Sequence, residues 1–260
     1  MRTHLRRAAD WVSLRRTLLG LIVILASCSD SSAPPKQAVV GTPVDPATAG
    51  TIRVDVTYSG AVPTPQVFDM RIAPQCAAAH QEPVYDDSLV VQDGHLASAV
   101  VWIKQGLEKW AFAPPSEPVI IDQKGCVYHP HVAAAMVGQP VDFVNSDPEA
   151  HNVHARPQIV SAFNFLMSRQ GSKRTLTFDK PEIAIPVGCD IHPWMSAYVA
   201  VVANPYFAVT PANGSVALTN VPPGEYVVAV WQEKLGTKEQ RVKLDARGSA
   251  NVEFAYAGAS

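Results

Sequence analysis

The stretch that decides the fold of this chain is Cys189-Asp190-Ile191-His192-Pro193-Trp194-Met195. It carries a thiol, an imidazole and a thioether, each three residues after the last. One loop can therefore present all three side chains to the same point. Thiolate, thioether and imidazole together are the ligand types of a copper site, so the loop predicts three of its four ligands. The fourth has to come from elsewhere in the chain.

The fourth candidate ligand is His151. It follows a polar turn, Asn145-Ser146-Asp147-Pro148-Glu149, and begins an apolar segment typical of a new strand. Apolar strand segments at 183–185 and 198–202 bound the Cys189 loop on its two sides. Structural zinc sites close with four His or Cys ligands, and a thioether serves poorly in them. The pattern therefore favours a copper ion over zinc, and the loop has no second cysteine for a dinuclear centre.

This pattern resembles the cupredoxins, the family of plastocyanin, azurin and amicyanin. The similarity rests on His-Asn-Val after a polar turn, followed by Cys-x-x-His-x-x-Met, and it covers roughly residues 119–202. The short ligand loop is closest to that of amicyanin. The resemblance implies a Greek-key β-sandwich that binds blue copper and transfers electrons.

Carried over position by position, the resemblance implies a role for each candidate residue. His151, Cys189 and His192 become the in-plane ligands, and Met195 becomes the weak and long axial ligand. Asn152 becomes a brace for the thiolate, because hydrogen bonds behind the ligands hold a ligand loop in place.

The resemblance also predicts a docking patch. In cupredoxins the histidine of the ligand loop reaches the surface through an apolar area, and Pro193 and Trp194 are the residues that would form it here. The alternative places Trp194 in the interior, between two domains.

The first residues predict export. A basic opening and an apolar run over 18–26 end in Leu25-Ala26-Ser27-Cys28, which resembles the lipobox of bacterial lipoproteins. Residues 1–27 are then the signal peptide. Cys28 is the acylated first residue of the mature chain, and its lipid anchors the protein to a membrane on the periplasmic side of the bacterial cell envelope. Arg15-Arg16 also resembles a twin-arginine signal, which would mean export after folding.

The remaining sequence predicts a linker and two sandwiches. Residues 28–49 are rich in Ser, Pro, Ala and Thr and predict a flexible linker. From residue 50 onward the pattern is almost wholly β, so the predicted fold class is all-β. The segment 209–254 contains a strand, a Pro-Pro-Gly turn and a strand, and resembles the carboxypeptidase-regulatory-like, transthyretin-type β-sandwich.

The domain order has two alternatives. Residues 50–118 offer too few strands to bury a core alone, so we expect them to complete the transthyretin-like sandwich together with residues 203–260. The cupredoxin unit, 119–202, would then be inserted into that sandwich. Simple tandem domains are the alternative.

Two further cysteines, Cys76 and Cys126, are left after the lipid and the copper site have used the others. An exported chain favours a disulfide between them. Histidines nearby, His80, His129 and His131, leave a second metal site as the alternative. No Cys-x-x-Cys-His occurs, which excludes a c-type haem.

Composition and motifs narrow the function. The formal net charge is -2 and no basic patch alternates with aromatic residues, so a nucleic-acid partner is not expected. No nucleophile elbow, phosphate loop or His-Glu-x-x-His is present, so an enzyme is not expected. The expected function is a membrane-tethered type 1 copper electron carrier, whose partner is a redox protein such as a c-type cytochrome or a copper oxidase. A copper storage or delivery protein and a metal-free cell-surface binding module are the alternatives.

Overall fold

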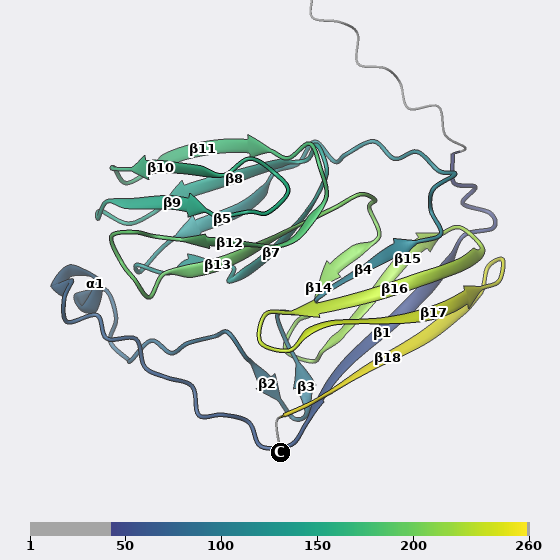
Figure 1. Ribbon diagram of the computed structural model, residues 1–260, viewed down its shortest axis with the longest axis horizontal. Coiled ribbons are helices and arrows are strands. Elements are labelled where there is room, and N and C mark those ends of the chain that lie inside the picture. Colours follow the sequence, from purple (N-terminus) through teal and green to yellow (C-terminus); the bar gives the residue numbers. More distant parts are fainter. Residues whose placement is uncertain (1–42, 259–260) are drawn as a thin grey trace, which may run out of the picture. The chain divides into compact units, whose positions relative to one another are not determined.

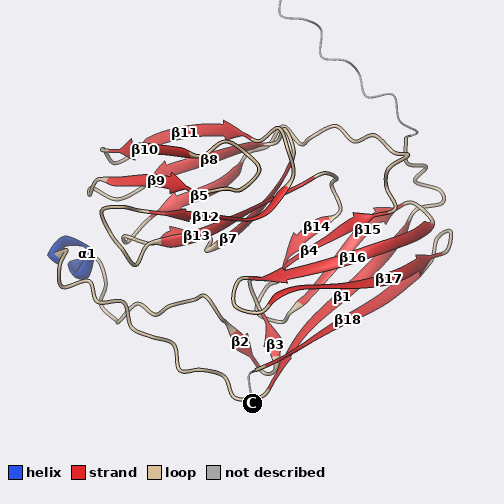
Figure 2. Ribbon diagram, in the orientation of Figure 1, coloured by secondary structure: helices blue, strands red, loops and turns tan. Residues whose placement is uncertain are grey.

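The computed structural model describes residues 43–258, and nearly all of its regular structure is β-strand (Figures 1 and 2). The all-β fold class predicted from the sequence is therefore confirmed. The predicted signal peptide, the predicted acylated Cys28 and most of the predicted linker lie outside the described residues. Within the described range, no helix has the length and apolar character needed to cross a bilayer.

Nine strands from the middle of the chain form one pair of sheets, called here the inner sandwich and drawn in teal and green in Figure 1. They are β5 (Val119–Gln123), β6 (Tyr128–His129), β7 (Val132–Met136), β8 (Pro140–Asn145), β9 (His151–Ala155), β10 (Phe163–Met167), β11 (Ser172–Thr177), β12 (Glu182–Gly188) and β13 (Ser196–Val202). One sheet has the order β10-β9-β12-β13-β7 and the other the order β11-β8-β5-β6. Fully buried Ile121, Phe143 and Val153 belong to the core cluster of this sandwich.

Strands from both ends of the described chain form a second pair of sheets, called here the outer sandwich. They are β1 (Gly50–Ser59), β2 (Val91–Gln92), β3 (His95–Leu96), β4 (Val100–Gln105), β14 (Phe207–Val209), β15 (Ser215–Val221), β16 (Gly224–Gln232), β17 (Gly236–Leu244) and β18 (Ser249–Ala257). One sheet is built around β1, which pairs with β15, β18 and β3, and the other has the order β14-β4-β16-β17. Along the chain, the inner sandwich is inserted between β4 and β14.

The alternation of side chains along β1 explains why this segment joins the outer sandwich. Ile52, Val54 and Val56 are all fully buried, whereas the residues between them, Arg53 and Asp55, are exposed. A period of two residues is what a strand with one face on a core requires. The alternating pattern thus commits the strand to one register, because a slip by one residue would bury the charges.

The connection between β1 and β2 leaves the outer sandwich and reaches the inner one. It carries the helix α1 (Pro74–Ala78), and Cys76 on this helix forms a disulfide with Cys126, with the Cα atoms 5.6 Å apart. The disulfide uses both sulfurs, so neither cysteine is a free thiolate that could bind a second metal ion. Of the histidines considered for that site, His80 donates to Gly125 O, and His131 lies against carboxylates.

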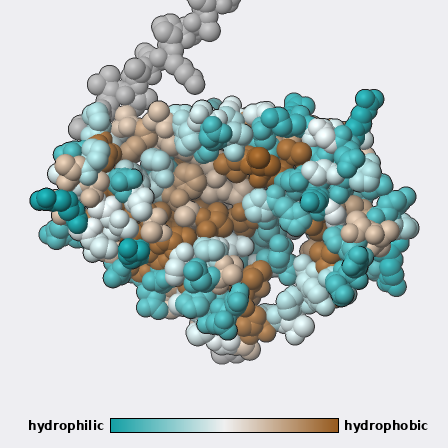
Figure 3. Space-filling model, turned by 180° about the vertical axis from the view of Figure 1, so that it is seen from behind, coloured by the Kyte–Doolittle hydropathy of each residue, from teal (hydrophilic) through white to brown (hydrophobic). Residues whose placement is uncertain are grey.

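Exposed apolar side chains are unevenly distributed over the described surface. On the face shown in Figure 3, hydrophobic residues gather towards the middle and hydrophilic residues around the rim. Over the whole described surface the exposed large hydrophobic residues are Val62, Val67, Ile72, Tyr85, Ile120, Ile159, Leu166 and Ile191. Four of these eight belong to the connection between β1 and β2, and one belongs to the Cys189 loop.

Candidate metal centre

Two neighbouring strands bring the candidate ligands together. His151 is the first residue of β9, and Cys189 directly follows the last residue of β12. These strands pair antiparallel, with Gly188 opposite His154, so the start of one lies beside the end of the other. The loop that leaves β12 returns as β13, which begins one residue after Met195. Strand pairing therefore places all four candidate ligands at one end of the sandwich.

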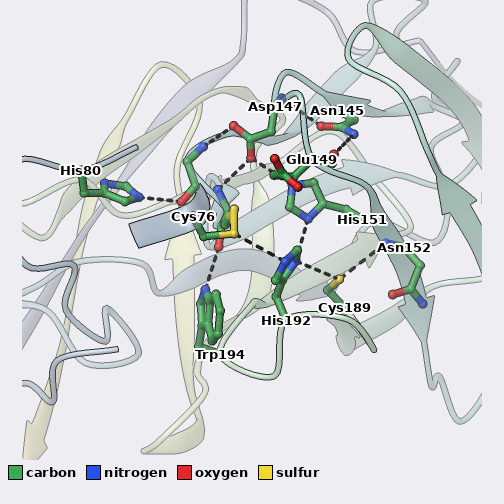
Figure 4. The surroundings of a disulfide bond; sticks show 12 residues. Cys76, His80, Asn145, Asp147, Glu149, His151, Asn152, Cys189, His192 and Trp194 are labelled. Carbon is green, nitrogen blue, oxygen red and sulfur yellow. Dashed lines mark hydrogen bonds and ion pairs between the residues drawn. A yellow bond between two sulfur atoms is a disulfide. The ribbon is translucent and has the colours of Figure 1, made fainter. Parts of the chain in front are cut away.

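Three ligand atoms converge at this end. The Nδ1 atoms of His151 and His192 lie 3.0 Å apart, and Cys189 Sγ lies 3.8 Å from His192 Nδ1 (Figure 4). All three atoms are within 4.8 Å of one another. His151 is 0% exposed, and Cys189 and His192 are 6% exposed each. The structure thus gathers the residues that the resemblance implied as in-plane ligands.

Met195 closes the ligand loop. Its side chain is buried, its carbonyl accepts a hydrogen bond from Cys189 N–H at 3.2 Å, and its own N–H donates to His192 O at 2.9 Å. These two bonds tie the beginning of the loop to its end. The loop is therefore a tight turn whose shape is fixed by its own backbone, with a buried thioether at its end.

Asn152 braces this loop through its backbone and its side chain. Its N–H points at Cys189 Sγ at 3.5 Å, and its Oδ1 accepts the N–H of Asp190 at 2.6 Å. The carboxylate of Asp190 in turn accepts hydrogen bonds from Asn152 Nδ2 and from His154. A hydrogen bond to the sulfur and an anchored neighbouring backbone both limit how far the thiolate can move.

Asp147 supports the other ligand strand, and sequence reasoning missed this residue. Its carboxylate accepts His151 Nε2–H at 3.0 Å and the backbone N–H groups of Gly125 and Cys126 at 2.6 and 2.7 Å. A proton on Nε2 leaves Nδ1 of His151 free to bind a metal. The sequence does show an acidic residue in a turn, four positions before the histidine. Whether its carboxylate points at the histidine is decided by the fold.

A buried polar network under the ligands was also missed. The Tyr128 hydroxyl donates to Asn152 O at 2.9 Å, and Gln123 Nε2 lies 3.2 Å from the same carbonyl and from the hydroxyl. Burial raises the pKa of Tyr128, so its hydroxyl keeps the proton that it donates. Both residues come from strands of the opposite sheet, and nothing in their own sequence pattern marks them.

The electrostatics of the site favour a thiolate. Burial by itself would raise the pKa of Cys189, but the hydrogen bonds from His151 and from the backbone N–H groups of Asn152 and His192 outweigh it and lower this pKa. Burial likewise works against a charged His151, yet Asp147 and Cys189 raise the pKa of His151 to about 9. Burial and the neighbouring His151 lower the pKa of His192. In the metal-free chain a thiolate therefore faces a protonated His151, and a metal ion that binds there would take the place of the proton on Nδ1.

The predicted docking residues differ from each other. Pro193 is exposed. Trp194 is half-buried, its ring lies against His192 with the centroids 5.3 Å apart, and its indole N–H donates to Cys126 O at 2.9 Å. Trp194 packs on the core cluster of the inner sandwich and is absent from the cluster that joins residues of both sandwiches. It therefore supports the ligand loop.

This donor set fits copper. Two imidazole nitrogens and a thiol sulfur converge here, and the loop that supplies two of these residues ends in the buried Met195. These are the ligand types that copper takes in electron-transfer sites. The outward nitrogens of the two rings face other groups, Asp147 in one case and Cys76 in the other, so both Nδ1 atoms remain for the metal.

Comparison with known proteins gives partial similarity to cupredoxins. No family model and no curated protein matches the chain. Among solved structures, a Cu-containing nitrite reductase (NirK) from Thermus scotoductus SA-01 is 26% identical over 37% of this chain and 24% of that chain, with a TM-score of 0.31. A Cu(I) structure of an amicyanin mutant is 22% identical over 32% of this chain and 81% of that chain, with a TM-score of 0.30. A purple cupredoxin from Nitrosopumilus maritimus is 21% identical over 32% of this chain and 98% of its own, with a TM-score of 0.28. The chain thus spans about a quarter of the length of the nitrite reductase that it matches.

Proposed function

We propose that this chain is a type 1 copper protein that carries electrons in the bacterial cell envelope. The observation that supports this most is the convergence of His151 Nδ1, His192 Nδ1 and Cys189 Sγ within 4.8 Å in a buried site. Copper held there would supply one-electron chemistry between Cu(I) and Cu(II). Soft sulfur ligands favour the reduced ion, and imidazole accepts either state.

The rigidity of the site suits a carrier. The ligand loop is closed by hydrogen bonds between Cys189, His192 and Met195, and Asp147 fixes the ring of His151. Ligands that are held in this way change their positions little when the charge of the ion changes. With four ligands contributed by the chain, no position is left open for a substrate, so we propose outer-sphere electron transfer and no enzymatic turnover.

Two other functions are less well supported. A storage or delivery protein would have to release its metal readily, whereas the ligands here lie at 6% exposure or less between strands. A metal-free cell-surface binding module would draw on the outer sandwich alone. It would leave unexplained why two imidazoles and a thiol with a lowered pKa face one another.

The N-terminal sequence and the type of site support a proposal for the location and the partner. We propose that lipid on Cys28 tethers the protein to a membrane on the periplasmic side. The partner is a redox protein such as a c-type cytochrome or a copper oxidase. Replacing Cys28 by Ser should move the protein from the membrane fraction to the soluble fraction of the cells, and continued membrane association would contradict the tether.

The visible spectrum with Cu(II) tests the metal centre. The wild-type protein should show an intense thiolate-to-copper absorption band, because the Cys189 thiolate would bind the Cu(II) ion directly. Cys189→Ser should abolish the band while the far-ultraviolet circular dichroism stays that of a folded β protein. His154→Ala is the matched control, since this residue lies on the same strand and contacts Asp190 but contributes no converging atom. A band that survives in Cys189→Ser, or weak absorption in the wild type, would reject the proposal.

A further inference from the structure

One edge of His192 is covered by a segment from outside the inner sandwich. His192 is 6% exposed, and its Nε2 lies 3.5 Å from Sγ of Cys76. Figure 4 shows Cys76 on the side of His192 away from Cys189, with Trp194 along the same imidazole. Cys76 belongs to α1, in the connection between two strands of the outer sandwich. The ligand histidine is therefore buried by a part of the chain that contributes no strand to its own sandwich.

The covering segment is a closed excursion, defined here as the cap, residues 66–86. Its two ends are joined by backbone hydrogen bonds, from Phe68 N–H to Val84 O and from Asp86 N–H to Gln66 O, both 2.8 Å. Between these ends the chain runs out to α1 and back. Because the ends hold each other, the cap can move away from the inner sandwich without unravelling the strands on either side of it.

Few groups hold the cap in place. Met70 and Cys76 are its buried residues that join the core cluster of the inner sandwich, and Phe68, Ala73 and Val84 pack against that cluster while partly buried. The remaining residues of α1 are exposed. Outside the disulfide, a hydrogen bond from His80 to Gly125 O at 2.7 Å links the cap to the turn that carries Cys126. Segments with few buried apolar contacts open at low free-energy cost, so the disulfide is the strongest restraint on this one.

We propose that the cap is a seal over the His192 side of the site, and that the Cys76–Cys126 disulfide is the clamp that keeps it shut. Both sulfurs lie in residues that are 1% exposed, so a clamp of this kind resists reduction and acts as a permanent fastening. Reagents, chelators and protein partners that approach His192 from this side meet the cap first. The seal is a property of the chain with or without copper, so its test is separate from that of the proposed function.

Chemical modification of histidines in the metal-free protein tests the seal. Diethyl pyrocarbonate acylates accessible imidazole nitrogens, and peptide mapping by mass spectrometry gives the rate at each residue. In the wild type, His192 should react as slowly as the fully buried His151, and exposed His129 should react fast and serve as the internal reference. Fast reaction of His192 in the wild type would overturn the proposal without the need of any variant.

The disulfide is tested by the double variant Cys76→Ser with Cys126→Ser. The rate at His192 should rise by about tenfold or more, because opening of the cap then breaks no covalent bond, while the rate at His129 should stay unchanged. Arg71→Ala is the matched control, since this exposed residue of the cap pairs with Asp69 alone. An unchanged rate at His192 in a folded double variant would show that the disulfide is not the clamp.

Removal of the cap gives a second and independent test. Residues 67–85 can be replaced by Asn-Gly in a chain that also carries Cys126→Ser, because Gln66 and Asp86 already lie within hydrogen-bond distance. His192 should then react at least as fast as in the double variant. A rate that stays at the wild-type level would show that something other than the cap protects His192, and would overturn the proposal.

Discussion

The two histidines proposed as ligands, His151 and His192, are held in opposite ways. His151 has a charged partner, since its Nε2–H donates to the buried carboxylate of Asp147. His192 has the Cys76 sulfur and the Trp194 ring as neighbours on its outward side, and its pKa is lowered by burial and by His151. One side of the site is thus fixed by an ionic hydrogen bond and the other by packing.

This difference indicates what each side contributes. A carboxylate behind an imidazole fixes its orientation and raises its basicity, so the His151 side should determine how strongly the metal is held. Packing fixes orientation without adding charge, so the His192 side should govern access to the metal. The two sides meet at Asp147, whose carboxylate also accepts the N–H groups of Gly125 and Cys126. In this turn both residues have positive φ, 64° and 55°, which aims two successive N–H groups at one carboxylate.

The largest effect is expected from Asp147→Asn. The amide keeps the shape but loses the charge, and it cannot accept all three hydrogen bonds of the carboxylate. Copper affinity, measured by competition with a chelator, should fall by about 10- to 100-fold, as for other losses of a partner behind a ligand. The reduction potential should rise, because removal of a negative charge destabilises Cu(II) more than Cu(I).

Asp142→Asn is the control for this change. Asp142 is also a buried carboxylate of the inner sandwich, but it is bonded to Lys173 and Thr175. This variant should lose stability and keep the affinity and the potential of the wild type. Equal loss of affinity in both variants would mean that Asp147 acts only through the fold.

Trp194→Ala addresses the packed side. The side chain is half-buried, so we expect a loss of about 2 kcal/mol in the free energy of unfolding, less than the 3–5 kcal/mol of a fully buried tryptophan. Copper affinity should change less than in Asp147→Asn. Trp194→Phe keeps a ring beside His192 and should recover most of the stability. An unchanged melting temperature in Trp194→Ala would instead favour the docking role first predicted for this residue.

Sequence patterns could predict the ligands but not what stands behind them. Cys189, His192 and Met195 share one loop, and local spacing is sufficient to identify them. The two backbone partners of Asp147 lie more than twenty positions upstream in a turn, and Cys76 reaches His192 across 116 positions of sequence. Contacts of this kind depend on strand pairing and on the path of a loop, and neither follows from the residues that take part. The alternating pattern of β1 likewise predicts a strand but not that it pairs with the last strand of the chain.

Met195→Leu tests whether the thioether of Met195 is the fourth ligand. The exchange of Met for Leu conserves volume, so the loss of stability should stay below about 1.5 kcal/mol. Copper and its colour should be kept, and the reduction potential should rise because a weak donor to Cu(II) is lost. Met167→Leu, a change at another buried methionine of the same core cluster, should leave the potential unchanged. An unchanged potential in Met195→Leu would show that its thioether is not a ligand.

The smallest effect is expected at His131, which lies outside the candidate metal centre but, like His151, contacts a carboxylate. His131 Nε2 lies 2.5 Å from Glu233 and Nδ1 lies 3.2 Å from Asp87, and Lys234 lies 3.5 Å from the same Glu233. Burial by itself would lower the pKa of His131, but the hydrogen bond to Glu233 and the charges of Asp87 and Glu233 outweigh it and raise this pKa. The contact with Glu233 is the shorter of the two, so Glu233 is the stronger partner.

Because the folded-state pKa of His131 lies above its ordinary value of 6.5, the folded protein binds this proton more tightly than the unfolded chain. The contribution to stability is then complete below pH 6.5 and is lost as the pH rises through the folded-state pKa, with a slope of at most about 1.4 kcal/mol per pH unit for one proton. Urea unfolding of the metal-free protein between pH 6 and 9 should show this decline, and His131→Gln should remove that part of it. If the stabilities of the wild type and of His131→Gln decline in parallel over this range, a carboxylate partner is not enough to stabilise a buried histidine here. The stabilising effect assigned to Asp147 at the metal centre would then have to come from its two backbone hydrogen bonds instead.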